Sequence, residues 1–238
     1  SGYNEDLMSR LAAAADGNHA FVESPRDLVK IFDSEFRDVL SIAALDIKIE
    51  IECAPGVRPI RIMNRDGDIR GGRVFVNLGQ VFASKEKYVL VELELPGNQN
   101  ARNIDVASAK IGYRGLDGFA QSVASPVVRA SFTTDSVAAA KSVKPEVREQ
   151  VVLQLATEAN EEAVRLRDEG KAKDAKKVLE DNAKFLRSEA AGAPSPAALQ
   201  QYADKNAADA EAVTKDDWTA QRKSMRESQY QNKTQQSY

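Results

Sequence analysis

The composition of the chain changes near residue 136, and that change limits the folds open to it. Of the 13 glycines, 11 lie before this point, together with 10 of the 15 aromatic residues. The rest consists of long stretches rich in Ala, Glu, Lys and Gln, most of which are strong helix formers. The sequence therefore predicts a turn-rich first part and a helical second part. Its 238 residues suit one large domain or two smaller ones.

The first 40 residues predict a helix, a short strand and a second helix. Asn4 suits the N-cap of a helix with one apolar stripe, and Gly17 suits its end. Residues 19–22 are too few for anything but a strand or a loop, and Pro25 suits the first turn of the next helix. One strand between two helices cannot form a sheet alone. The segment is either the end of a doubly wound α/β domain or a piece that packs on the region after it.

The second of these helices has a wide apolar face. Its large members are Leu28, Ile31, Phe32 and Phe36. A soluble monomer rarely exposes such a patch, so we expect residues 1–40 to fold back onto the following region or to pair with a second copy. Folding back is the preferred prediction, because the helix connects directly to the next segment.

Residues 42–133 alternate apolar and polar side chains, the period-2 pattern of strands with one wet face. Further strands are expected within residues 57–63, 104–113 and 121–132, and clusters of Gly, Asn and Asp separate the candidates. About six or seven short strands at this spacing predict an antiparallel β-sandwich. The residues expected to face one core are Ile47, Ile49, Ile51, Val74, Val76, Val89, Val91 and Leu93.

Residues 145–190 predict a helical hairpin. Pro145 suits a helix start, and Gly170 interrupts the apolar periodicity and divides the segment into two helices. The small residues where the two helices meet resemble a single tetratricopeptide-type unit, although one copy cannot build a solenoid and a packing hairpin is the preferred interpretation. Residues 191–196 predict a linker and 197–212 another helix, and the polar tail from about Gln229 is expected to be disordered.

Composition excludes several classes of function. The single cysteine, Cys53, leaves no intrachain disulfide and no cysteine-rich zinc site, and the single histidine, His19, leaves no site that needs two imidazoles and supports no serine–histidine–carboxylate triad. Cys53 is interpreted as a packed apolar residue and His19 as a structural or exposed one. A net charge of −3 argues against a nucleic-acid partner. No apolar run is long enough to span a membrane, and no signal-peptide pattern opens the chain.

Three motifs have a chemical and a structural interpretation. Residues 64–68 superficially resemble a calcium loop but lack the glutamate at its twelfth position, so they predict a β-turn. Residues 115–118 predict a hairpin turn. The charged run over residues 161–169 predicts a solvated helix surface with favourable close ion pairs. We therefore predict no catalytic residue, no cofactor-binding residue and no metal ligand in this chain.

The beginning of the chain contains Tyr-Asn-Glu-Asp-Leu-Met at residues 3–8, Leu-Ala at 11–12, Gly-Asn at 17–18, His-Ala-Phe-Val at 19–22 and an amphipathic helix after them. In these residues it resembles the end of a von Willebrand factor type A domain. The resemblance is strongest with the bacterial calcium-activated chloride channel-like and inter-alpha-trypsin inhibitor heavy chain-like group. There a β-rich region follows the A domain, as do Ala-Leu-Asp-Ile-Lys-Ile-Glu-Ile at 44–51 and Lys-Tyr-Val-Leu-Val-Glu-Leu at 87–93 here.

The resemblance covers about residues 1–133 and leaves the helical part unexplained. Such A domains bind a divalent metal through an Asp-x-Ser-x-Ser motif near their first strand, and this chain contains no such motif. The resemblance therefore implies that the metal-site half of the A domain is missing, and that a divalent metal belongs to a full-length A domain. It also suggests an extracytoplasmic or membrane-anchored setting.

Together these observations predict an α+β fold. An antiparallel β-sandwich at 41–136 follows the αβα end of a von Willebrand A-type domain at 1–40. A helical hairpin at 137–190 and a linker, helix and disordered tail at 191–238 come after it. The expected function is a non-enzymatic protein-interaction or scaffold region with a protein partner. The alternatives are a self-assembly module of a membrane-associated complex, for example as a homodimer, and an enzyme with an unrecognised site.

Overall fold

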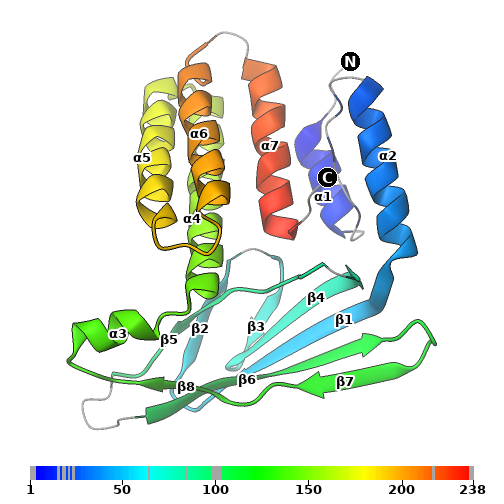
Figure 1. Ribbon diagram of the computed structural model, residues 1–238, viewed down its shortest axis with the longest axis vertical. Helices are drawn as coiled ribbons and strands as arrows, with labels where there is room; N and C mark the ends of the chain where they lie inside the picture. Colours follow the sequence, from blue (N-terminus) through cyan, green and yellow to red (C-terminus); the bar gives the residue numbers. More distant parts are fainter. Residues whose placement is uncertain are drawn as a thin grey trace. The chain divides into compact units, whose positions relative to one another are not determined.

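The computed structural model describes residues 4–14, 17, 20, 22, 25–63, 65–83, 85–97, 103–215 and 218–235. The chain divides into two compact units (Figure 1). A helical unit comprises residues 1–21 and 141–237, and a β-rich unit comprises residues 22–140. The fold is mixed α/β, with an antiparallel sheet and, in the described ranges, seven helices.

The β-rich unit contains a six-stranded antiparallel sheet and a separate two-stranded sheet. The large sheet has the order β3-β4-β1-β6-β7, and β8 pairs with β6 beyond the end of β7; β2 and β5 form the small sheet. The strands are β1 Ile42–Cys53, β2 Arg58–Ile62, β3 Asp68–Arg70, β4 Arg73–Phe82, β5 Val91–Glu94, β6 Asn103–Arg114, β7 Ala120–Ala124 and β8 Val128–Ser131. Helix α2 (Pro25–Leu40) runs directly into β1, and helix α3 (Ser136–Ser142) follows β8.

The alternating residues of the sequence form the core of the large sheet. In the antiparallel register of β1 and β4, Ile49 lies opposite Val76 and Ile51 opposite Val74. Val74 is fully buried. Seven of the eight predicted residues share one apolar cluster that also takes in Ile62 of β2, and Leu93 joins a neighbouring cluster around Val57 and Val106. The predicted shared core face is thus confirmed for seven of the residues.

A two-glycine turn adds a strand that the sequence pattern did not show. Arg70 pairs with Arg73, so only Gly71 and Gly72 connect β3 to β4. Their φ angles are 56° and 80°, the left-handed backbone that a two-residue hairpin turn requires and that glycine adopts without strain. The residues after the predicted turn at 64–67 thereby form a short edge strand.

The helical unit contains four long antiparallel helices and a short one. They are α1 Glu5–Ala14, α4 Pro145–Asp168, α5 Ala172–Ala190, α6 Pro196–Ala212 and α7 Trp218–Thr234. Helix α5 packs between α4 and α6, and α7 packs against α4. The break between α4 and α5 falls at Gly170, whose φ of 81° is typical of a glycine that ends a helix. Two apolar clusters, one toward each end, fill the space between the helices.

Two expectations about the ends of the chain were wrong. The segment from Gln229, predicted to be disordered, continues helix α7 to Thr234, and Gln229 and Tyr230 are buried. Residues 1–40 do not stay together as one segment, because α1 belongs to the helical unit and contacts α7, whereas α2 belongs to the β-rich unit. Asn4 does cap α1, since its Oδ1 accepts a hydrogen bond from the backbone N–H of Leu7 at 3.0 Å.

Candidate functional site

The structure places the sequence's few reactive candidates in ordinary surroundings. Cys53 ends β1 as a half-buried free thiol, and burial raises its pKa, which makes it less reactive. His19 lies outside the described residues, as does Asn64 of the calcium-like loop. Residues 115–118 form the predicted hairpin turn between β6 and β7, where the N–H of Gly118 donates to the carbonyl of Gly115 at 3.0 Å.

An open hollow lies at the β3–β4 hairpin, lined by Asp68, Arg70, Gly71, Arg73 and Phe75. Both of its arginines already have carboxylate partners. Arg70 contacts Asp68 at 2.7 Å, and Arg73 bridges two glutamates of β1 at 3.2 and 3.4 Å. These exposed pairs contribute little free energy, and their charges are compensated. The hollow therefore has no concentrated charge to offer a ligand.

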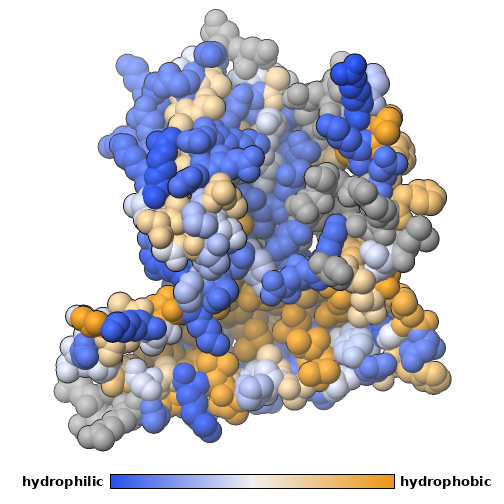
Figure 2. Space-filling view, viewed as in Figure 1, coloured by the Kyte–Doolittle hydropathy of each residue, from blue (hydrophilic) through white to orange (hydrophobic). Residues whose placement is uncertain are grey.

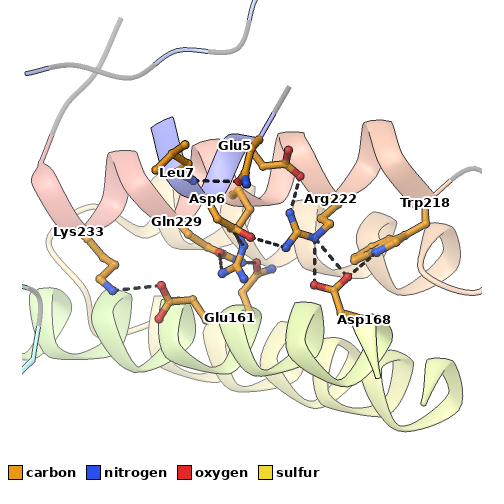
Figure 3. A network of polar contacts seen from close by, with 12 residues as sticks. Glu5, Asp6, Leu7, Glu161, Asp168, Trp218, Arg222, Gln229 and Lys233 are labelled. Atoms are coloured by element: carbon orange, nitrogen blue, oxygen red, sulfur yellow. Dashed lines mark hydrogen bonds and ion pairs between the residues drawn. The ribbon is translucent and has the colours of Figure 1, made fainter. Parts of the chain in front are cut away.

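The most developed polar site is a cluster centred on Arg222 of α7 (Figure 3). We call it the Arg222 cluster, and it contains Arg222, Glu5, Asp6, Asp168 and Trp218. The Arg222 Nε donates to both carboxylate oxygens of Asp168, at 2.9 and 3.2 Å, and Nη2 donates to Asp6 at 2.7 Å. Nη1 donates to Glu5. One guanidinium thus joins α1, α4 and α7.

Electrostatics keep Asp6 and Arg222 ionised. Burial alone would raise the pKa of Asp6, but the Arg222 hydrogen bond and the charges of Arg226, Arg222 and Arg10 together hold it below its usual value. Burial alone would lower the pKa of Arg222, and the hydrogen bonds to Asp6, Asp168 and Glu5 raise it instead. These two groups therefore remain charged at neutral pH. The arrangement is suited to fastening helices together and not to proton transfer.

Arg167 extends the Arg222 cluster at Trp218, the first residue of α7. The indole Nε1 of Trp218 donates to Asp168 at 2.8 Å, and the Arg167 guanidinium lies 5.6 Å from the centre of the indole ring, a cation–π contact. Arg167 also donates to the carbonyls of Val213 and Lys215, at 2.7 and 3.2 Å. These contacts fix the connection between α6 and α7 against α4.

The charged run over residues 161–169 is consequently only partly the solvated surface that the sequence predicted. Arg165 does form exposed pairs with Glu162 and Glu169. Glu161 instead accepts from Lys233 at 3.1 Å, and Asp168 accepts from Trp218 and Arg222. The sequence contained no signal for this, because the partners lie 50 or more residues away in a segment with few apolar residues.

A second candidate is the apolar face of α2. Phe36 is 72% exposed, Phe32 and Val29 are each 61% exposed, and Leu28 is also exposed. Their spacing places them on one face of the helix, opposite charged residues such as Lys30. The β-rich unit also presents apolar side chains over its strands on the face shown in Figure 2. Apolar side chains gathered on one exposed face are typical of interaction surfaces.

Neither a metal site nor a membrane span was found in the part of the chain that the structure describes. No three His, Cys, Asp or Glu side chains there converge as metal ligands would. No described helix combines the length and the apolar character needed to cross a bilayer.

Comparison with known proteins places the fold. No family model matches the chain. Over 110 residues it is 29% identical to the uncharacterized protein YfbK of Escherichia coli strain K12, an alignment that covers 42% of this chain and 18% of that protein.

Solved structures match much more of the chain. A von Willebrand factor type A protein from Catenulispora acidiphila matches 92% of this chain and 50% of its own length, with a TM-score of 0.66 and 15% identity. The ArnB paralog VWA2 from Sulfolobus acidocaldarius matches 90% of this chain and 52% of its own length, with a TM-score of 0.51 and 16% identity. The fold is thus similar to that of about half of each of these von Willebrand factor type A proteins. The likeness extends into the helical part, which the sequence resemblance left unexplained.

Proposed function

We propose that this chain is a non-enzymatic protein-interaction or scaffold region of a von Willebrand A-type protein. The observation that carries the proposal is the exposed apolar face of α2, formed by Leu28, Val29, Phe32 and Phe36. A helix with two phenylalanines more than half exposed gains free energy when another protein surface covers them, at about 25 cal/mol per Å² of apolar area. Binding to a protein partner accounts for the exposure of these apolar residues, whereas catalysis does not.

The occupant that we propose for this face is the remaining part of an A domain. The chain spans about half the length of the two solved structures described above. On this proposal, residues 1–40 are the end of the A domain, the two β-sheets form the sandwich after it, and α4 with α5 forms the helical hairpin. A divalent metal would belong to the A-domain half that this chain lacks, and the setting would be bacterial and extracytoplasmic.

The decisive experiment adds the polypeptide encoded upstream in the same reading frame to this chain and measures complex formation by light scattering. We expect a one-to-one complex that the Phe32→Ser/Phe36→Ser variant fails to form. The matched control, Lys30→Ser/Asp33→Ser, changes charged residues of the same helix and should bind as the unmodified chain does. Equal binding by all three chains would show that the α2 face is not the contact.

The second candidate function is self-assembly, because the same α2 face is suited to pairing with a second copy of this chain. Light scattering of this chain alone over a range of concentrations distinguishes the two functions. A molar mass that rises toward twice the monomer value, and falls back with Phe32→Ser/Phe36→Ser, favours self-assembly. A mass that stays at the monomer value at every concentration counts against it.

A further inference from the structure

Four buried side-chain amides meet at one level of the helical unit, one from each long helix. They are Asn160 of α4, Asn182 of α5, Asn206 of α6 and Gln229 of α7, and we call them the amide layer. All four are at least 96% buried. Because unsatisfied buried amides are costly, four of them at one level require a matching set of hydrogen bonds.

The amides satisfy one another across the helices. The Oδ1 of Asn206 accepts from Asn160 at 2.9 Å and from Asn182 at 3.0 Å. The Oδ1 of Asn160 accepts from Gln229 at 2.6 Å. Backbone carbonyls complete the set, since Asn182 also donates to Ala156 at 2.8 Å and Asn206 donates to Tyr202 at 2.9 Å.

Apolar residues lie on both sides of the amide layer. One cluster contains Val152, Ala156, Leu186, Leu199 and Ala203, and the other contains Ala163, Leu179, Ala210, Val213 and Met225. On α4, α5 and α6 each amide therefore stands about one helical turn from an apolar residue on either side. The layer is thus flanked by apolar residues on these three helices, although Gln154, Thr157 and Asp209 are further buried polar residues of the same unit.

This arrangement penalises any sliding of one helix by a turn. If α7 moved by four residues, Met225 or Lys233 would take the place of Gln229 opposite Asn160. The methionine would leave the Asn160 oxygen without its donor, and the lysine would bring a charge into the core. If α5 moved, Leu179 or Leu186 would face Asn206 while Asn182 entered an apolar cluster. The small alanines around the layer would not resist such movements by shape alone.

We propose that the amide layer is a register lock, which selects one alignment of the four helices over alignments displaced by a turn. The best-attested use of a buried polar residue between helices is of this kind, where it fixes alignment at some cost in stability. The lock matters most for α7, whose buried residues are few: Met225, Gln229 and Tyr230. Its position thus depends on specific polar contacts more than on apolar area.

The test uses the full chain and a chemical reporter of the alignment. Lys233 Nζ lies 3.1 Å from Glu161 Oε1, so carbodiimide coupling should join these two residues, with the product identified by mass spectrometry. The principal variant is Asn160→Leu/Gln229→Leu, which removes both members of the Gln229–Asn160 hydrogen bond together with the Asn160 donor to Asn206, and leaves Asn182 donating to Asn206. The matched control is Gln154→Leu, which removes a buried amide from the same helix pair, donating to the Asn232 carbonyl at 3.0 Å, outside the layer.

For the double variant we expect a folded helical unit whose dominant Lys233 cross-link shifts from Glu161 to a carboxylate one turn away, such as Glu158, or to a second copy of the chain. The control should retain the Glu161 cross-link. Two results would overturn the proposal. One is a double variant that stays monomeric with the Glu161 cross-link unchanged. The other is a double variant that unfolds, which would show that the amides supply stability instead of alignment.

Discussion

The hydroxyl of Tyr230 donates a hydrogen bond to the backbone carbonyl of Gly17 at 2.7 Å, across 213 residues of sequence. It lies two helical turns beyond Arg222, which contacts the first turn of α1. Helix α7 therefore binds both the start of α1 and the segment just after its end. The apolar side chains of Leu7, Met8 and Leu11 remain exposed, so polar contacts hold much of this interface together.

Replacing Arg222 should destabilise the helical unit substantially. In Arg222→Leu, three carboxylates lose their shared partner, and Glu5 is buried. We expect a loss of about 3 kcal/mol in the free energy of unfolding, the low end for breaking a buried ion pair, because Asp6 and Asp168 keep some solvent. Urea denaturation followed by helical circular dichroism measures it. The comparison is Arg165→Leu, whose exposed pairs with Glu162 and Glu169 should contribute less than about 1 kcal/mol. Equal losses would contradict the assigned role of Arg222.

Asp209 predicts a pH dependence of stability. Burial raises the pKa of Asp209 to about 6, against the counteracting charge of Lys205 and hydrogen bonds from Asn160 and Gln221. One of its oxygens, Oδ2, has no hydrogen-bond partner. Since the folded pKa exceeds the unfolded value near 3.8, this group costs nothing below pH 3.8. The cost grows between pH 3.8 and 6 and is complete above pH 6.

The variant Asp209→Asn should remove that dependence. At pH 7.5 we expect it to be more stable than the unmodified chain by about 1–3 kcal/mol, because a shift of one pKa unit corresponds to about 1.4 kcal/mol and any hydrogen bond that the new amide fails to form reduces the gain. Thermal unfolding at intervals from pH 4 to 7.5 provides the measurement. If the stability difference between the two chains were the same at every pH, Asp209 would not be the group responsible.

Truncating Leu78 should lower the stability of the chain strongly, whereas truncating Phe36 should leave it almost unchanged. Leu78 is buried in the β-sheet core, so Leu78→Ala should cost about 2–5 kcal/mol through lost burial and a residual cavity. Phe36 is largely exposed on α2, so Phe36→Ser should change the stability of this chain by less than about 0.5 kcal/mol. Chemical denaturation of both variants checks the pair. A large loss for Phe36→Ser would mean that the α2 face is already covered within the chain.

The β3–β4 hairpin offers a test of backbone strain. Gly72→Ala forces an alanine into the left-handed region, which should cost about 1–2 kcal/mol even though a Cβ there would meet no atom within 4 Å. Gly97→Ala is the matched control, because a Cβ there also meets nothing within 4 Å and the backbone is not left-handed. The control should be neutral or slightly stabilising. Differential scanning calorimetry measures the melting temperatures of the two variants. Equal melting temperatures would show that the turn assignment is wrong.

The sequence predicted the strands well where one face is wet and the other packed. Ile49 and Val76 follow the period-2 pattern because each strand packs one face on a core, and this pattern is visible in any short window. The helix boundaries at Pro145 and Gly170 could be predicted for a similar reason, because the backbone preferences of proline and glycine are local.

The candidate site could not be predicted in this way. Trp218 and Arg222 lie in a polar helix with few apolar residues, and their partner Asp168 is 50 or more residues away. Nothing local distinguishes an arginine that joins three carboxylates from one that faces solvent. Glu5 and Asp6 suit the first turn of any helix, and that ordinary interpretation hides their pairing with Arg222.

The helical unit is discontinuous in sequence, because residues 22–140 are inserted between α1 and the remaining helices. During synthesis α1 leaves the ribosome before the β-rich unit, and the residues that bind it and Gly17 after it, Arg222 and Tyr230, are made more than 200 residues later. The entropic cost of closing so long a loop is modest, since each doubling of length adds only about 0.6 kcal/mol. The delay between the synthesis of α1 and that of α7 has the larger effect, because α1 lacks its α7 contacts until translation of α7 is complete. A stop codon before residue 218 would therefore leave α1, near the other end of the chain, without its contacts to α7.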